Sequence, residues 1–289
     1  MILRATHTTT YIYSEPVSIC HTEVHLVPRA DRNQHVLEHH LAILPAPEQT
    51  FPRRDYFGND VTYFSIYEPH RTLTITSRGV LEIEESDPLE PSLTPAWEEA
   101  RGEAWWDKAG RDREPRAMRE YQFIFASPRI PLGAEFAAYA RLSFPPERPL
   151  LDAALDLCHR VHQDFEYDQR ATTVSTPVAD LLHKRRGGCQ DFAHFMIACL
   201  RSLGLGARYV SGYLRGETLI GAEASHAWVS VFCPGIGWLD LDPTNDCQVN
   251  GDHLTLAWGR DYSDVPPVKG VSIGGGEHVI NVSVHVTSG

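Results

Sequence analysis

Three residues of this chain have the types and the order that covalent catalysis requires: Cys189, His226 and Asp242. A cysteine attacks a carbonyl carbon as its thiolate, an imidazole transfers the protons, and a carboxylate holds that imidazole in the correct tautomer. Each residue alone has a simpler explanation, as a buried thiol, a polar strand position or a turn-capping group. Together they favour a catalytic triad of nucleophile, base and orienting group.

The segment around Cys189 predicts the start of a helix. Two glycines precede the cysteine, and apolar residues then recur every three or four positions until Gly204 ends the pattern. At a helix N-terminus the free backbone N–H groups and the helix dipole stabilise a thiolate. Gly187 and Gly188 leave room there for a second backbone or a substrate to approach closely.

Two predicted strands carry the partners of this cysteine. His226 opens the strand "SHAWVSVF", and Asp242 ends the strand "GWLDLD" just before a Pro-Thr turn. The short connection "CPGIG" indicates an antiparallel pair, which would bring the two side chains together. A preceding helix packed on this pair would place Cys189 against the imidazole.

The remaining chain predicts an α+β protein in three parts. Residues 1–85 contain short strands rich in Thr, Tyr, Val and Ile, and predict an N-terminal antiparallel β-sandwich. Residues 86–132 combine prolines and mixed charges, as expected of a connector with short helices. Residues 133–289 predict helices followed by strands, which indicates a catalytic core with helices packed on an antiparallel sheet.

The segments "RRGGCQDFAHFMIACLRSLGLGARYVSGY" and "SHAWVSVFCPGIGWLDLDPT" resemble the transglutaminase-like core of the papain-related cysteine acyl-transfer enzymes. The resemblance covers about residues 150–245. Residues 1–85, mainly through "DYFGNDVTYF", resemble the β-rich N-terminal domain that precedes this core in a bacterial subgroup. The resemblance implies a papain-like, transglutaminase-like fold with Cys189 as nucleophile and His226 as general base and acid. It also implies that Asp242, which precedes Pro-Thr, orients the histidine in preference to Asp240.

The chain departs from the animal transglutaminases in its tryptophans. Those enzymes carry a tryptophan after the catalytic cysteine and use another, upstream, to stabilise the oxyanion. Here Gln190 follows the cysteine, and no tryptophan lies between Trp106 and Trp228. We therefore expect Tyr167 and the backbone N–H of Cys189 to donate to the oxyanion, and we assign Tyr167 and Gln190 to oxyanion or substrate binding.

The expected function is cysteine-dependent acyl transfer on an amide bond, either a glutamine carboxamide or a peptide or isopeptide bond of a peptide or protein substrate. A thioester would form and would then be resolved by water or by an amine. Hydrolysis is slightly favoured, because a dedicated amine site requires additional architecture. Two alternatives stay open: a true protein-glutamine gamma-glutamyltransferase, and a catalytically inactive binding module with this fold.

Composition limits the other classes of function. The formal net charge of −12 argues against nucleic-acid and anionic-membrane binding, and no run of apolar residues is long enough to span a bilayer. Six cysteines without a CxxC pair, in a chain lacking a signal-peptide pattern, indicate reduced thiols in the cytoplasm. The oligomeric state is left open.

No cofactor or metal is expected. The chain lacks an EF-hand loop, so calcium dependence is not supported. The segments "HVLEHH" (35–40) and "CHRVH" (158–162) have ligand-like spacing, but no completing ligands accompany them.

Overall fold

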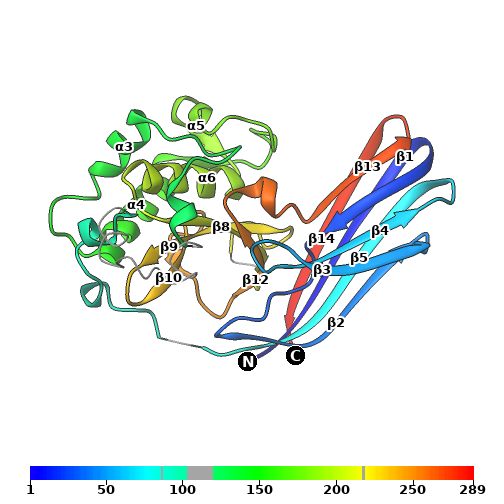
Figure 1. The fold of residues 1–289 in the computed structure, drawn as a ribbon, viewed down its shortest axis with the longest axis horizontal. Coiled ribbons are helices and arrows are strands. Elements are labelled where there is room, and N and C mark those ends of the chain that lie inside the picture. Colours follow the sequence, from blue (N-terminus) through cyan, green and yellow to red (C-terminus); the bar gives the residue numbers. More distant parts are fainter. Residues whose placement is uncertain (86, 103–119, 217–218) are drawn as a thin grey trace, which may run out of the picture.

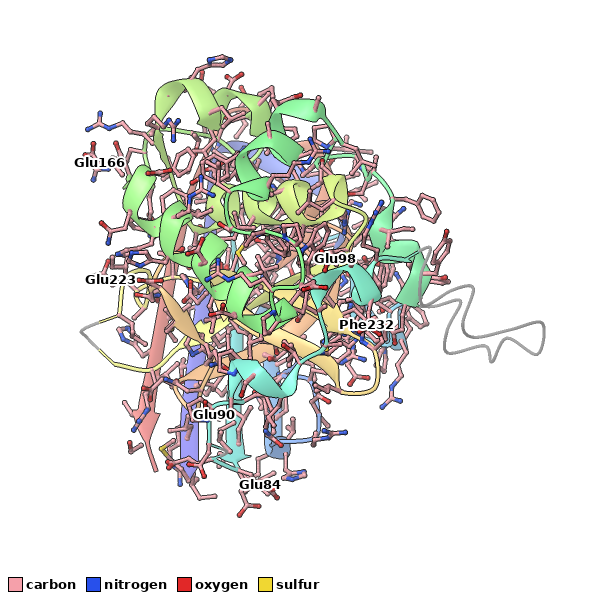
Figure 2. All side chains as sticks on the ribbon, turned by 90° about the vertical axis from the view of Figure 1, so that its left-hand side faces the viewer. Glu84, Glu90, Glu98, Glu166, Glu223 and Phe232 are labelled. Atoms are coloured by element: carbon pink, nitrogen blue, oxygen red, sulfur yellow. The ribbon has the colours of Figure 1, made fainter. Side chains whose placement is uncertain are left out.

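The computed structural model describes residues 1–85, 87–102, 120–216 and 219–289. It contains a lobe of long β-strands beside a lobe in which helices pack on a second sheet (Figure 1). Both chain ends lie together at one end of the β-rich lobe. Acidic side chains such as Glu84, Glu90, Glu166 and Glu223 lie at the outside of the molecule, around a densely filled interior (Figure 2).

The N-terminal sheet is antiparallel and is organised around one long strand. β1 pairs with β5 through Ile2–Ile12 and with β4 through Cys20–Val24, and the register shifts between these two segments. The antiparallel strands that the sequence predicted are thus present, and the expected β-sandwich takes the form of one 7-stranded sheet that is curled and shares the strand β1 throughout. The strands of this part are β1 (Ile2–Val24), β2 (Gln34–Leu44), β3 (Gln49–Arg54), β4 (Asp60–Ile66) and β5 (His70–Ile83).

The last two strands correct the predicted domain boundaries. We assigned residues 133–289 to the core, but β13 (Val268–Gly274) and β14 (His278–Ser288) both pair with β1. A strand of this length offers two hydrogen-bonding edges, and the C-terminal hairpin pairs with the edge that β4 and β5 leave free. The β-rich lobe is thus assembled from both ends of the chain.

The helices that the sequence predicted ahead of the strands are present in the second lobe. They are α3 (Ala134–Arg141), α4 (Leu150–Asp164), α5 (Val178–Lys184) and α6 (Cys189–Ser202). The central helix α6 is buried on nearly all sides, because the other helices and the sheet surround it. It therefore gives its first residue a rigid support.

The sheet of this lobe has the order β11-β10-β9-β8-β12. Its strands are β8 (Ala207–Leu214), β9 (His226–Cys233), β10 (Gly237–Asp242), β11 (Cys247–Gln248) and β12 (His253–Gly259). The expected antiparallel pair is present, since Val229 of β9 faces Leu241 of β10. A short parallel pair, β6 (Glu166–Tyr167) with β7 (Arg186–Gly187), precedes α6.

Specific polar contacts join the two lobes. The side chain of Asn59, in the β3–β4 hairpin, donates to the carbonyl of Trp258 and accepts from its backbone N–H. The Arg29 guanidinium carbon lies 3.5 Å from the centre of the Trp258 ring. The hairpin that contains Asn59 is thus an attachment point between the lobes.

The connector contains only short helical turns among the residues that the structure describes. These are η1 (Pro91–Leu93), η2 (Trp97–Ala100) and η3 (Gln122–Ile124), in agreement with the short helices expected between residues 86 and 132. Residues 103–119 of that connector lie outside the described residues. In the described parts of the chain, every helix is too short or too polar to traverse a bilayer.

Candidate active site

Cys189 is the first residue of α6, directly after Gly188 in the N-cap position. The carboxylate of Asp191 accepts the Gly188 N–H at 2.9 Å and the Thr172 hydroxyl at 2.5 Å, which fixes the first turn. The cysteine side chain is partly exposed, whereas residues 191–201 of the same helix are buried. The predicted nucleophile is therefore held at a helix N-terminus and remains accessible.

The two glycines before the cysteine have different roles. A Cβ on Gly187 would lie 2.8 Å from Cβ of Asp191 and 2.9 Å from Cδ1 of Leu181. A Cβ on Gly188 would meet its nearest neighbour, Cα of Gln169, only at 3.8 Å. The space beside Gly187 is thus taken by side chains of the protein itself, and the room that we expected for a substrate is not found there.

His226 and Asp242 form a buried ion pair. Nε2 of His226 donates to Oδ2 of Asp242 at 2.8 Å, and both side chains are inaccessible to solvent. The pairing of β9 with β10 brings the first residue of one strand next to the last residue of the other. Asp240, the alternative orienting group, instead accepts a hydrogen bond from Ser230.

The electrostatics link this pair to the cysteine. Burial alone would lower the pKa of His226, but the negative charge of Cys189 and the hydrogen bond to Asp242 outweigh it and raise the pKa to about 10. Burial would raise the pKa of Asp242, yet His226 and His253 hold it well below its usual range. The charged forms of His226 and Asp242 thus stabilise each other in this buried position.

Asp242 has further donors that the sequence analysis did not identify. Its Oδ2 atom also accepts from Nδ2 of Asn245 at 2.8 Å and from Nε2 of His253 at 3.2 Å. Its Oδ1 atom accepts the Thr244 N–H at 2.9 Å. The turn spacing could have pointed to Asn245, three residues after the aspartate. The sequence gives no local signal that relates His253 to Asp242, because β9 and β8 lie between their strands in the sheet.

Asn245 also anchors a loop over the imidazole. It accepts the Ile220 N–H at 2.8 Å and donates to the Ile220 carbonyl at 3.3 Å. The next residue, Gly221, has φ of +92°, and a Cβ there would lie 2.7 Å from Nδ1 of His226 and 3.3 Å from the Tyr167 hydroxyl. Only glycine permits this close approach of backbone to the imidazole.

Tyr167 lies close to the start of α6. The β6–β7 pairing sets it opposite Gly187, two residues before Cys189. Burial, reinforced by the charge of Cys189, raises the pKa of Tyr167 to about 12, so its hydroxyl stays protonated and can donate. Gln169 donates to the same hydroxyl at 2.7 Å. Gln190 is partly buried on the first turn of α6, and among the described residues its side chain makes no hydrogen bond.

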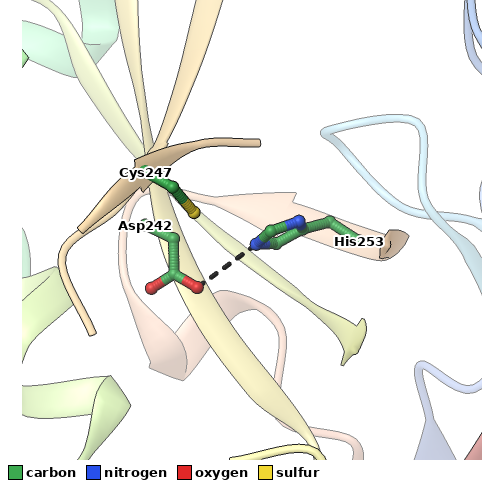
Figure 3. Close-up of side chains that lie close together, drawn as sticks. All are labelled: Asp242, Cys247 and His253. Carbon is green, nitrogen blue, oxygen red and sulfur yellow. Dashed lines mark hydrogen bonds and ion pairs between the residues drawn. The ribbon is translucent and has the colours of Figure 1, made fainter. Parts of the chain in front are cut away.

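The histidines of the two histidine-rich segments bond to other side chains and carbonyls. His35 pairs with Glu84, and His39 bonds to Ser77. On α4, His159 pairs with Asp246, while His162 bonds to the carbonyl of Thr244. A different group of potential ligands does converge, namely Asp242, Cys247 and His253 (Figure 3). The sequence analysis identified neither Cys247 nor His253.

A buried helix with a cysteine at its N-terminus, set against a histidine and an aspartate from an antiparallel sheet, defines the transglutaminase-like class of fold. Residues 138–243 match the transglutaminase-like superfamily, and residues 3–82 match the bacterial transglutaminase-like N-terminal region. The chain belongs to the transglutaminase-like superfamily.

Similar proteins match either the whole chain or part of it. The uncharacterized protein Rv2569c of Mycobacterium tuberculosis is 41% identical over 98% of this chain and 91% of its own length. A protein-glutamine gamma-glutamyltransferase of Pseudomonas aeruginosa is 35% identical, but over only 29% of this chain and 14% of its own length. The crystal structure of a "Putative Cysteine Protease" from Cytophaga hutchinsonii has the same fold. Its TM-score is 0.76 at 19% identity, over 100% of this chain and 90% of that one.

Proposed function

We propose that this protein is a cysteine-dependent acyl-transfer enzyme that cleaves an amide bond through a thioester on Cys189. The observation that carries the proposal is the buried His226–Asp242 pair at 2.8 Å, whose imidazole also interacts with Cys189 at the start of α6. A non-catalytic scaffold gains nothing from three ionisable groups in this order, since burying charge is costly. The arrangement therefore supports an enzyme over an inactive binding module.

The reaction would proceed in two half-reactions. The Cys189 thiolate attacks the amide carbon, forming a C–S bond, while the backbone N–H of Cys189 and the Tyr167 hydroxyl stabilise the oxyanion. The His226 imidazolium gives its proton to the leaving nitrogen as the C–N bond breaks. His226 then accepts a proton from the incoming water or amine, which resolves the thioester and restores the thiolate.

Hydrolysis and amine transfer differ only in the second half-reaction. Cys189 is partly exposed, and water has access to it without a dedicated site. We therefore place hydrolysis of a glutamine carboxamide or a peptide or isopeptide bond slightly ahead of cross-linking. A protein-glutamine gamma-glutamyltransferase is the second candidate, which the short match to the Pseudomonas protein favours.

One experiment tests the proposal and separates the two outcomes. Glutamine-containing peptides and casein are incubated with the protein, with and without a primary amine, and are analysed by mass spectrometry. Conversion of glutamine to glutamate or backbone cleavage supports hydrolysis, whereas incorporation of the amine supports transfer. Cys189→Ala is the control. If wild type and Cys189→Ala yield identical products, and Cys189 reacts with iodoacetamide no faster than the other cysteines, the proposed function is wrong.

A further inference from the structure

Three side chains with metal-ligating atoms converge beneath the candidate active site. The ligand atoms of Asp242, Cys247 and His253 all lie within 4.8 Å of one another (Figure 3). Nε2 of His253 lies 3.2 Å from Oδ2 of Asp242. Asp242 and His253 are buried, while Cys247 is partly exposed at an edge strand of the sheet, which provides a path from solvent.

The donor set is one that zinc prefers. Thiolate sulfur, imidazole nitrogen and carboxylate oxygen are the three ligand types of tetrahedral zinc sites. Bonds of about 2.0–2.3 Å in a tetrahedron separate such ligand atoms by roughly 3.4–3.6 Å. Because the ligand atoms lie within 4.8 Å of one another, no pair of them has to approach by more than about 1.4 Å. Hard cations such as calcium and magnesium would instead require oxygen ligands.

The surroundings of His253 suit either state of its ring. At present Nε2 faces the Asp242 carboxylate as a donor, and Nδ1 lies 3.4 Å from the Asn250 N–H. Nδ1 also lies 3.3 Å from Oδ1 of Asn250, which could accept a proton from it. A histidine that binds a metal through Nε2 carries its proton on Nδ1, and an acceptor normally fixes that tautomer. Asn250 provides such an acceptor.

From this convergence we propose that Asp242, Cys247 and His253 form a zinc-binding site that switches off the triad. Binding forms a Zn–S bond as the Cys247 thiol releases its proton to solvent, and the proton of His253 moves from Nε2 to Nδ1. Oδ2 of Asp242 then binds the metal as well as accepting from His226. The His226 ring then shares its acceptor atom with the metal, so the hydrogen bond that orients the ring towards Cys189 weakens. This regulatory consequence rests on the proposed function, whereas the metal site does not.

The metal site is tested first in full-length Cys189→Ala, because this variant lacks the thiol beside His226 that could also bind a metal. Titration with Co²⁺, the spectroscopic substitute for zinc, is expected to give thiolate-to-cobalt charge transfer and the intense visible bands of a four-coordinate site. Cys189→Ala/Cys247→Ser should lose the charge-transfer band. Its affinity should fall by at least the roughly 10–100-fold that losing even an outer partner costs. The control variant Cys189→Ala/Cys20→Ser, which is altered in the β-rich lobe, should keep the charge-transfer band and the affinity for Co²⁺.

Two results would overturn the site. If wild type binds Co²⁺ through a thiolate and Cys189→Ala does not, the metal binds Cys189 and His226 instead. If Cys189→Ala/Cys247→Ser retains the charge-transfer band, another cysteine is the ligand. Circular dichroism checks that each variant is folded, and Cys189→Ala/His253→Gln, which must also lose affinity, replaces any variant that is not.

The regulatory step has a separate readout. Zinc should slow iodoacetamide alkylation of Cys189 in wild type and should leave it unchanged, at the same free zinc concentration, in Cys247→Ser. Equal slowing in both proteins contradicts the switch. If Cys189 is unreactive even without zinc, the proposed function fails, while the cobalt spectra still decide the metal site.

Discussion

Nε2 of His226 lies 2.8 Å from Oδ2 of Asp242, in a position where neither side chain touches solvent. A buried ion pair of this kind does little for stability compared with apolar packing, because both groups lose their hydration. Its effect is on the neighbouring thiol, since a charged imidazole stabilises a thiolate. The following predictions examine this pair, the glycines and loop around it, and the tyrosine beside it.

Replacement of His226 by Ala should slow alkylation of Cys189. The interaction of a thiolate with a charged imidazole contributes about 1.5–3 kcal/mol. Loss of the His226 imidazole should therefore lower the thiolate population of Cys189 roughly 10–100-fold at neutral pH. The rate is measured with iodoacetamide and peptide mass spectrometry, using the other five cysteines as internal references. His285→Ala, an exposed histidine of β14, is the matched control and should leave the rate unchanged. Equal rates for His226→Ala and wild type would refute the pairing.

Asp242→Asn should destabilise the protein by roughly 3–5 kcal/mol, because it removes one partner of a buried pair. The raised pKa of His226, about 10 in the folded protein against 6.5 unfolded, contributes stability that is complete below pH 6.5. That contribution disappears as the pH rises towards 10. The lowered pKa of Asp242 contributes stability above about pH 4 that disappears in acid.

The difference in unfolding free energy between wild type and Asp242→Asn should therefore be largest near pH 5–6 and should shrink in both directions. Urea denaturation across the pH range measures it. Asp246→Asn breaks the exposed pair with His159 and should cost less than about 1 kcal/mol. A difference that does not vary with pH would show that the two groups are not ionised together in the folded state.

Gly187→Ala should destabilise the first turn of α6, whereas Gly188→Ala should be tolerated. A methyl group at residue 187 would lie 2.8 Å from Cβ of Asp191, and overpacking of this kind costs typically about 1–3 kcal/mol. At residue 188 the nearest atom is 3.8 Å away, so the methyl group fits, and only the preference of an N-cap for glycine over alanine is lost, at about 0.5–1 kcal/mol. Thermal unfolding of both variants measures the contrast, and the opposite order would contradict it.

Asn245→Ala should release the loop that covers His226. The Ile220 N–H loses its acceptor and Asp242 loses a donor, each at 2.8 Å. Hydrogen–deuterium exchange of residues 219–225 should become faster, with little change in the β-rich lobe. Asn281→Ala, at an exposed position of β14, is the control. Unchanged exchange in residues 219–225 would mean that other contacts hold the loop.

Tyr167→Phe should separate thiolate formation from oxyanion stabilisation. The hydroxyl, with its pKa raised to about 12, remains a donor across the working pH range. Its loss should lower kcat on an amide substrate roughly 10²–10³-fold and leave alkylation of Cys189 close to the wild-type rate. Gln190→Ala should have a smaller effect on both. Wild-type turnover in Tyr167→Phe would assign the second oxyanion donor elsewhere.

Much of the fold was readable from the sequence because the decisive signals are local. The apolar period of three and four marks α6, the glycines mark its start, and the short connection between His226 and Asp242 predicts their antiparallel pairing. These same signals placed the three candidate catalytic residues together. The β3–β4 hairpin likewise follows from a local signal, because Gly58, Asn59 and Asp60 are residues that favour turns.

Other features depend on contacts between distant parts of the chain, and no local pattern encodes them. The pairing of β14 with β1 joins residues more than 250 positions apart, and it is decided by which strand edge remains free. His253 contacts Asp242 from β12, which two strands separate from β10 in the sheet, and no spacing in the sequence encodes this contact. The sequence thus determined which residues could perform the chemistry. The tertiary structure decided which others contact them, because burial and hydrogen bonding act between neighbours in space.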